Sequence, residues 1–101
     1  MGISIRLEDE HGNVEETLDW PTGLDRLLPE YEDESFPCLR FVDPYGDTLF
    51  NRMHMPTLLR ELDRLHQRAN TDTEHSHLSE IGRLAERCLS EVHLYLRFCG
   101  D

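Results

Sequence analysis

Six histidines are the residues of this chain with the clearest capacity for chemistry, and two of them lie among carboxylates. Asp72, Glu74, His75 and His77 offer ligands that suit zinc or another divalent ion, and His66 lies close enough in sequence to join them. The spacing argues against a shared ion. Side chains two positions apart on a helix point about 200° apart, so His75 and His77 can share a ligand only in an extended segment. We therefore expect a solvated helix start, no metal and no other cofactor.

The three cysteines Cys38, Cys88 and Cys99 are the candidate nucleophiles. An odd number without CxxC spacing argues against a disulfide framework and favours reduced thiols. None stands in a nucleophile motif, and covalent catalysis would also need a base and an orienting group beside the thiol. The six glycines are scattered, so a glycine-rich phosphate loop is missing. We expect Cys88 in the core and no enzymatic activity.

Charge is divided very unevenly along the chain. Residues 1–47 hold 13 acids and three arginines, whereas residues 48–101 hold 8 acids and seven arginines. The net charge of −11 is therefore concentrated in the first half. A small domain stays dispersed with less charge, so such a field favours binding of a basic partner. The same charge repels phosphate, which disfavours direct binding of nucleic acid.

Two acidic segments each contain a tyrosine, the kind of amphipathic anchor that protein interfaces favour. We expect both segments to lie on one surface, although an ordinary hydrophilic loop and an ordinary turn would have the same composition. Arginines at positions 60, 64 and 68 form a row along one helix. This row is either a solvated helix face or a surface that binds part of the acidic half within the fold, or a partner. The candidate partner-binding residues are Glu30, Tyr31, Glu32, Asp33, Glu34, Asp43, Tyr45 and Asp47.

Hydrophobic periodicity predicts the elements of the first half. Alternation of apolar and polar residues indicates two strands joined by a turn, with Val14 and Leu18 on the buried side of the second strand and Glu16 out of pattern. A proline-bounded apolar group predicts a short helix, and the acidic run after it predicts an exposed loop. In order, these elements are residues 3–7, 14–18, 23–28 and 29–35.

The second half is predicted to begin with a hairpin, because a Pro and Gly turn separates two segments rich in aromatic and branched residues. Two amphipathic helices follow, the second with Val92 at the end of its apolar stripe. A final strand places Leu94, Leu96 and Phe98 on one face. These elements are strands 36–42 and 47–50 around the turn 43–46, helices 56–69 and 74–91, and strand 93–99.

The resulting order β-β-α-β-β-α-α-β predicts a single α+β domain over residues 1–101, with a mostly antiparallel sheet and helices packed on one face. The last strand is expected beside the first strand or the middle hairpin. Apolar runs are too short for a membrane span or a signal peptide, so we expect a cytoplasmic protein that does not associate with a membrane.

These features favour a small inhibitor of the immunity or antitoxin type that blocks a basic, nucleic-acid-handling partner such as a toxin or nuclease. The general build is similar to that of bacterial immunity and antitoxin proteins, although no motif names a family. Three alternatives stay open. A DNA mimic would need acids along an extended face, an adaptor or regulatory subunit would share the composition, and a small metal-dependent enzyme would use His75 and His77.

Overall fold

Four strands and two long helices account for most of the chain in the computed structural model, which describes residues 2–20 and 26–100. The predicted helix 23–28 lies largely outside the described residues, and Arg26 and Leu27 form a 3₁₀ turn. The elements are β1 (Ile3–Asp9), β2 (Val14–Trp20), η2 (Leu39–Phe41), β3 (Asp47–Phe50), η3 (Arg52–His54), α1 (Met55–Arg68), α2 (Asp72–Ser90) and β4 (Leu94–Cys99).

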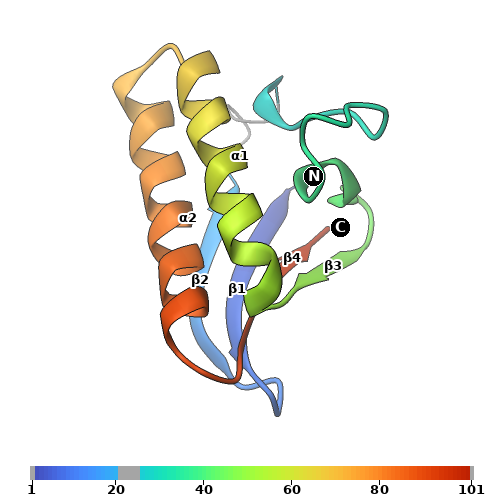
Figure 1. Cartoon of the computed structure of the whole chain (residues 1–101), viewed down its shortest axis with the longest axis vertical. Helices are drawn as coiled ribbons and strands as arrows, with labels where there is room; N and C mark the ends of the chain where they lie inside the picture. The colour runs from blue at the N-terminus through green and yellow to red at the C-terminus, as the bar shows by residue number, and fades with distance from the viewer. Residues whose placement is uncertain (1, 21–25, 101) are drawn as a thin grey trace.

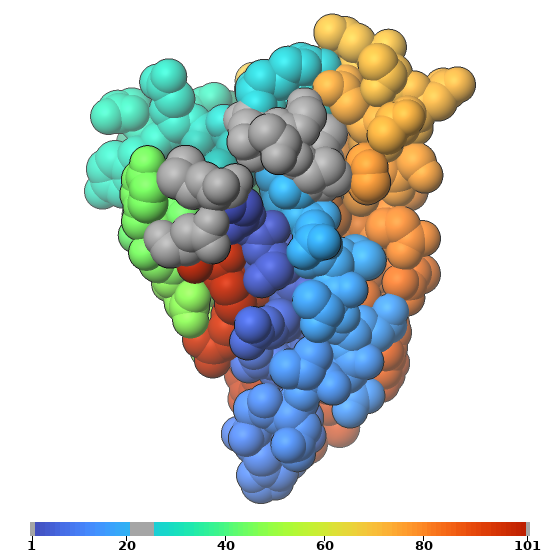
Figure 2. Space-filling model, turned by 180° about the vertical axis from the view of Figure 1, so that it is seen from behind, coloured from blue at the N-terminus to red at the C-terminus, as the bar shows by residue number. Residues whose placement is uncertain are grey.

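The strands form one antiparallel sheet in the order β2-β1-β4-β3. Helices α1 and α2 lie side by side across one face of this sheet (Figure 1). Figure 2 looks onto the opposite face, where side chains of β1, β2 and β4 lie at the surface. The α+β fold with helices on one face is therefore confirmed, and β4 neighbours both β1 and β3.

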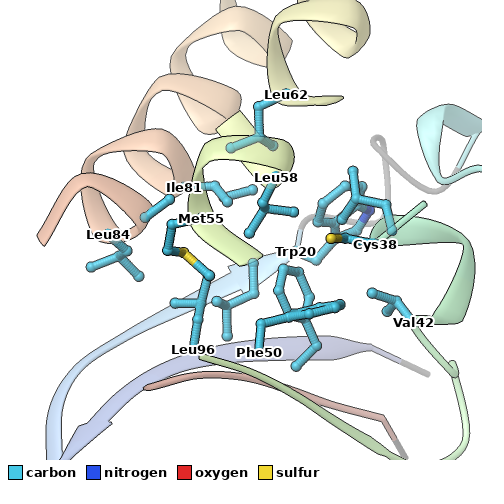
Figure 3. Packing of buried hydrophobic residues seen from close by; sticks show 14 of the residues in the cluster. Trp20, Cys38, Val42, Phe50, Met55, Leu58, Leu62, Ile81, Leu84 and Leu96 are labelled. Atoms are coloured by element: carbon cyan, nitrogen blue, oxygen red, sulfur yellow. The ribbon is translucent and has the colours of Figure 1, made fainter. Parts of the chain in front are cut away.

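The core fills the space between the helices and the sheet (Figure 3). Leu96 and Phe98 of β4 point into it, as predicted from their alternation with polar residues. Leu58 and Leu62 of α1, one helical turn apart, belong to the same buried cluster on the helix side. Full burial of one such side chain contributes roughly 1.5–3 kcal/mol, so this layer is the main source of stability.

Both helices begin and end close to the predicted residues because each carries a local start signal. Pro56 stands in the first turn of α1, where its missing N–H costs nothing. The side chain of Thr71 accepts a hydrogen bond from the backbone N–H of Glu74 and caps α2. The helical periods of the sequence were therefore sufficient to place this layer.

The predicted strand 36–42, and with it the middle hairpin, is wrong. Phe36 is fully buried between two turns, and Leu39 begins the 3₁₀ helix η2. The backbone N–H groups of Cys38 and Leu39 donate to the carboxylate of Glu61 on α1 over 2.8–3.2 Å, so they are not available to a sheet. Strand β3 pairs with β4 instead, although the predicted turn 43–46 is present.

Two predictions of burial also fail. A β-bulge shifts the register between β1 and β2 so that Leu7 faces Glu16 and Glu8 faces Val14. The bulge turns Val14 outward and leaves it exposed. Val92 is exposed as well, because α2 ends at Ser90 before the apolar stripe reaches it.

Glu16 faces the helix layer at the edge of the sheet, where it meets two arginines of α2. Its carboxylate accepts hydrogen bonds from Arg83 over 2.9 and 3.0 Å and from Arg87 over 2.8 Å. Arg83 also pairs with Glu80, and Arg87 with Glu91. The residue that breaks the strand pattern thus joins the acidic half to the arginines of the second half.

This network predicts acid-sensitive stability. Hydrogen bonds from Arg83, and then from Arg87, lower the pKa of Glu16 from 4.5 to about 2. The stabilisation is therefore complete above about pH 4.5 and is lost as the pH falls toward 2, since the unfolded chain binds the proton first. Thermal unfolding from pH 6 to pH 2.5 should show a shallower acid decline for Glu16→Gln than for wild type.

Glu86 is an exposed acid on α2, the helix of Arg83 and Arg87, and it has no ion pair among the described residues. Glu86→Gln is therefore the matched control. Its melting temperature should follow that of wild type at every pH. Equal acid declines in all three proteins would remove Glu16 as a source of the pH dependence.

Candidate functional site

The acidic loop, residues 30–34, is an ordered pair of turns anchored in the core. The N–H of Asp33 donates to the carbonyl of Glu30 over 3.0 Å, and the N–H of Phe36 donates to that of Asp33 over 3.1 Å. The Phe36 ring is fully buried and fixes the end of these turns. The exposed carboxylates of Glu30, Glu32 and Glu34 are therefore carried on a defined backbone.

Arg64 and Arg68 of the arginine row on α1 contact the residues that directly follow the acidic loop. Arg64 donates a hydrogen bond to the carbonyl oxygen of Ser35, and the guanidinium of Arg68 lies 4.8 Å from the centre of the Phe36 ring. The Ser35 hydroxyl, assisted by the positive charges of Arg68 and Arg64, lowers the pKa of Asp33. All three arginines of the row stay exposed, as a solvated helix face requires, and Arg64 and Arg68 also contact residues of the acidic half within the fold.

Arg40 joins the acidic loop to η2 through two aromatic rings. Its guanidinium carbon lies 5.1 Å from the centre of the Tyr31 ring and 4.8 Å from that of Phe41, and the two rings meet edge to face at 5.7 Å. Glu34 is 3.9 Å from the same guanidinium. Tyr31 nevertheless remains 62% exposed and Phe41 49% exposed, so both rings are available to a partner.

The turn after η2 presents a further aromatic ring. Asp43 accepts a hydrogen bond from the N–H of Tyr45 over 2.8 Å, which fixes the turn while the Tyr45 ring stays 69% exposed. Gly100 lies against this turn so closely that an added Cβ would come within 2.5 Å of the Pro44 backbone. Asp47 begins β3 and pairs with Arg97 over 3.5 Å, so this predicted residue is partly engaged within the fold.

We call the acidic loop, Phe41 and the segment 43–47 together the acidic-aromatic surface. Contact between Tyr31 and Phe41 joins the loop to η2, which the segment follows in the chain. Among the described residues, Glu30, Glu32 and Asp43 have no ion pair, whereas Glu16 is paired. The structure therefore leaves unpaired negative charge beside exposed aromatic rings.

Sequence reasoning missed three residues that shape this surface: Arg40, Phe41 and Glu61. The first two lie in the segment that was predicted as a strand. Glu61 carried a signal, because it occupies an inward position of α1 beside Leu58, Leu62 and Leu65. A carboxylate on the apolar stripe of a helix needs buried partners, and here these are the N–H groups at the start of η2.

The histidine cluster does not assemble as a shared site. His75 lies on a helix and meets His66 of α1, with their Nδ1 atoms 2.9 Å apart, whereas His77 lines a groove beside Glu80. Glu74 accepts hydrogen bonds from Arg26 and from the Asn70 backbone. No group of three or more potential metal ligands gathers within residues 2–20 and 26–100.

Two of the three cysteines are buried thiols. Burial, with the charge of Glu61 as a smaller cause, raises the pKa of Cys38 to about 12, and burial raises that of Cys88 to about 11. Both are therefore protonated near neutral pH and lack the thiolate that a nucleophile needs. The predicted core position of Cys88 is confirmed.

Comparison of the chain with protein-family models, with curated proteins and with solved structures gives no match. Within the part of the chain that the structure describes, no helix is long and apolar enough to cross a membrane.

Proposed function

We propose that this protein is a small cytoplasmic inhibitor of the immunity or antitoxin type, which binds a basic partner protein such as a toxin or nuclease. The observation that carries the proposal is the acidic-aromatic surface, where the exposed rings of Tyr31 and Tyr45 stand beside carboxylates without ion pairs. Carboxylates attract a basic protein over a distance, and aromatic side chains supply the contact area that holds it.

Order in the free protein supports this proposal. Glu61 fixes η2 from inside the core, and Arg64 and Arg68 fix the acidic loop from α1. A surface that is already ordered loses less conformational entropy on binding, so more of its contact energy appears as affinity. Blocking a partner enzyme requires such a fixed surface and no chemistry of its own.

The alternatives receive less support. A DNA mimic needs rows of free carboxylates, but Glu8, Glu16 and Asp47 are paired with arginines. A metal-dependent enzyme would need His75 and His77 to converge, and they lie on different sides of α2. An adaptor or regulatory subunit could use the same surface, and the identity of the captured partner distinguishes it from an inhibitor.

The partner is best captured from a lysate of the source organism at low salt with wild-type protein as bait, and identified by mass spectrometry. A variant with Tyr31→Ala and Tyr45→Ala is the matched bait for background. Inhibition of the activity of a captured basic enzyme would support the proposal. Capture of only acidic or neutral proteins, in equal amounts by both baits, would contradict it.

We predict that association with this partner slows strongly as salt rises. Charges steer an encounter over roughly one Debye length, about 8 Å at physiological ionic strength, and steering of this kind raises association rates by about 10-fold to 1,000-fold. Stopped-flow measurements from low to high salt would report the rate. An association rate that does not change with salt would count against electrostatic capture.

A further inference from the structure

His66 in the last turn of α1 and His75 in the first turn of α2 form a direct bridge between the helices. Their Nδ1 atoms are 2.9 Å apart, their ring centres 5.2 Å apart, and their planes differ by 7°. The separation of the centres is about the nitrogen distance plus the radius of each ring. This is possible only if the two rings lie end to end, with their Nδ1 atoms facing each other along one line.

Two facing imidazole nitrogens can hold one hydrogen between them. One ring donates its N–H and the other accepts with its lone pair, and this arrangement persists when the pair takes up a single extra proton at a distal nitrogen. A second proton makes both rings imidazolium. Both Nδ1 atoms would then carry hydrogen, the bond would be lost, and two positive charges would face each other.

Several charged groups lie close in sequence or space to the two histidines. Asp63 and Asp72 stand one turn before His66 and His75, respectively. The carboxylate of Glu74 is bound by Arg26 over 2.6 Å. Arg68 adds a positive charge in the last turn of α1, where His66 also lies, and its guanidinium is placed over the Phe36 ring.

We propose that His66 and His75 form a proton-sensitive clasp, which ties the end of α1 to the start of α2 near neutral pH and opens when both rings are protonated. The unfolded chain binds two protons where the clasped pair holds at most one, so the contribution of the clasp to stability falls as the pH falls through the histidine range, about pH 8 to 5. Arg64 and Arg68, which flank His66 in the sequence of α1, contact Ser35 and Phe36, so loss of order at this end of the helix should also loosen that segment.

Nuclear magnetic resonance of the wild-type protein tests the clasp without any partner. A nitrogen–nitrogen coupling between the His66 and His75 rings should be present at about pH 7.5 and absent at about pH 5. Protection of the Ser35 and Phe36 amides from exchange should decrease over the same range. No coupling at any pH, or rings that titrate independently, would overturn the proposal.

Thermal unfolding of variants gives the second readout. Between about pH 7.5 and 5, wild type should lose about 4–8 °C more in melting temperature than His75→Ala, the shift expected from one hydrogen bond in a domain of this size. His77→Ala, two positions further along the same helix, should behave as wild type. An equal pH dependence in wild type and His75→Ala would show that the contact is not a switch.

Discussion

The Glu61→Ala variant is expected to lose about 3 kcal/mol of unfolding free energy, the largest stability effect that we predict for a single polar residue here. Glu61 is fully buried, and its carboxylate is the acceptor for the backbone N–H groups of Cys38 and Leu39. Its removal leaves both donors buried without a partner, at a cost of roughly 1–3 kcal/mol each. Urea unfolding monitored by circular dichroism would measure the loss.

Two further variants separate the role of Glu61 from general damage to α1. Glu61→Gln keeps one oxygen acceptor at the same position and should lose less stability than Glu61→Ala. Asp63→Ala alters an exposed acid on the same helix and should change stability by within about 0.5 kcal/mol. If Glu61→Ala were no less stable than Asp63→Ala, the buried carboxylate would not be what holds η2.

Truncation of Tyr31 or Tyr45 is expected to weaken partner binding by about 2 kcal/mol or more, roughly a 30-fold increase in Kd. Each ring is more than half exposed in the free protein and stands among carboxylates, so it can be buried only on binding. Calorimetric titration of the captured partner into Tyr31→Ala and Tyr45→Ala would give the affinities. Tyr45→Ala should unfold within about 0.5 kcal/mol of wild type. Tyr31→Ala also removes the ring contacts with Phe41 and Arg40, so it should lose about 1 kcal/mol of unfolding free energy.

Neutralising Glu32, Asp33 and Glu34 together should act differently, because charges at the rim of an interface mainly change the association rate. Met53 is the control for loss of an exposed apolar side chain, since it is 83% exposed and lies outside the acidic-aromatic surface. Met53→Ala should bind as wild type does. Unchanged affinity in both tyrosine variants would move the interface elsewhere, with the outer face of α1 the next candidate.

The elements that could be predicted from sequence are those whose signal is local. Strand β4 alternates Leu94, Leu96 and Phe98 with polar residues, and all three are buried as that period requires. The helices carry both a period and a start signal in Pro56 and Thr71. Neither feature depends on a distant part of the chain, so periodicity was enough to predict the fold class.

The segment 36–42 could not be predicted in the same way, because its conformation depends on a residue more than 20 positions away. Aromatic and branched side chains suit a strand, yet here Phe36 and Leu39 are buried by turns that Glu61 stabilises. The bulge opposite Leu7 is another tertiary effect, and it turns the side chain of Val14 from the core side of the sheet to the solvent side. Pairing between distant residues overrode local preference at both places.

The candidate site was partly predictable. The composition identified the acidic loop and the turn, and the structure leaves Tyr31 and Tyr45 exposed there. The uneven distribution of charge has a second role that composition alone did not reveal, because Glu16 and Glu8 pair with arginines of the second half. Part of the acidic half therefore serves the fold in β1 and β2, whereas Glu30, Glu32 and Asp43 in the loop and the turn have no ion pair among the described residues.

Amide hydrogen exchange of this chain, free and in complex with the captured basic partner, is the most direct test of the acidic-aromatic surface. Binding through this surface predicts slower exchange in residues 31–34 and 41–47 of the complex, with little change at the exposed Met53 and Val92. Protection confined to the outer face of the sheet or to the segment around Met53, with residues 31–34 and 41–47 unchanged, would contradict the proposed function.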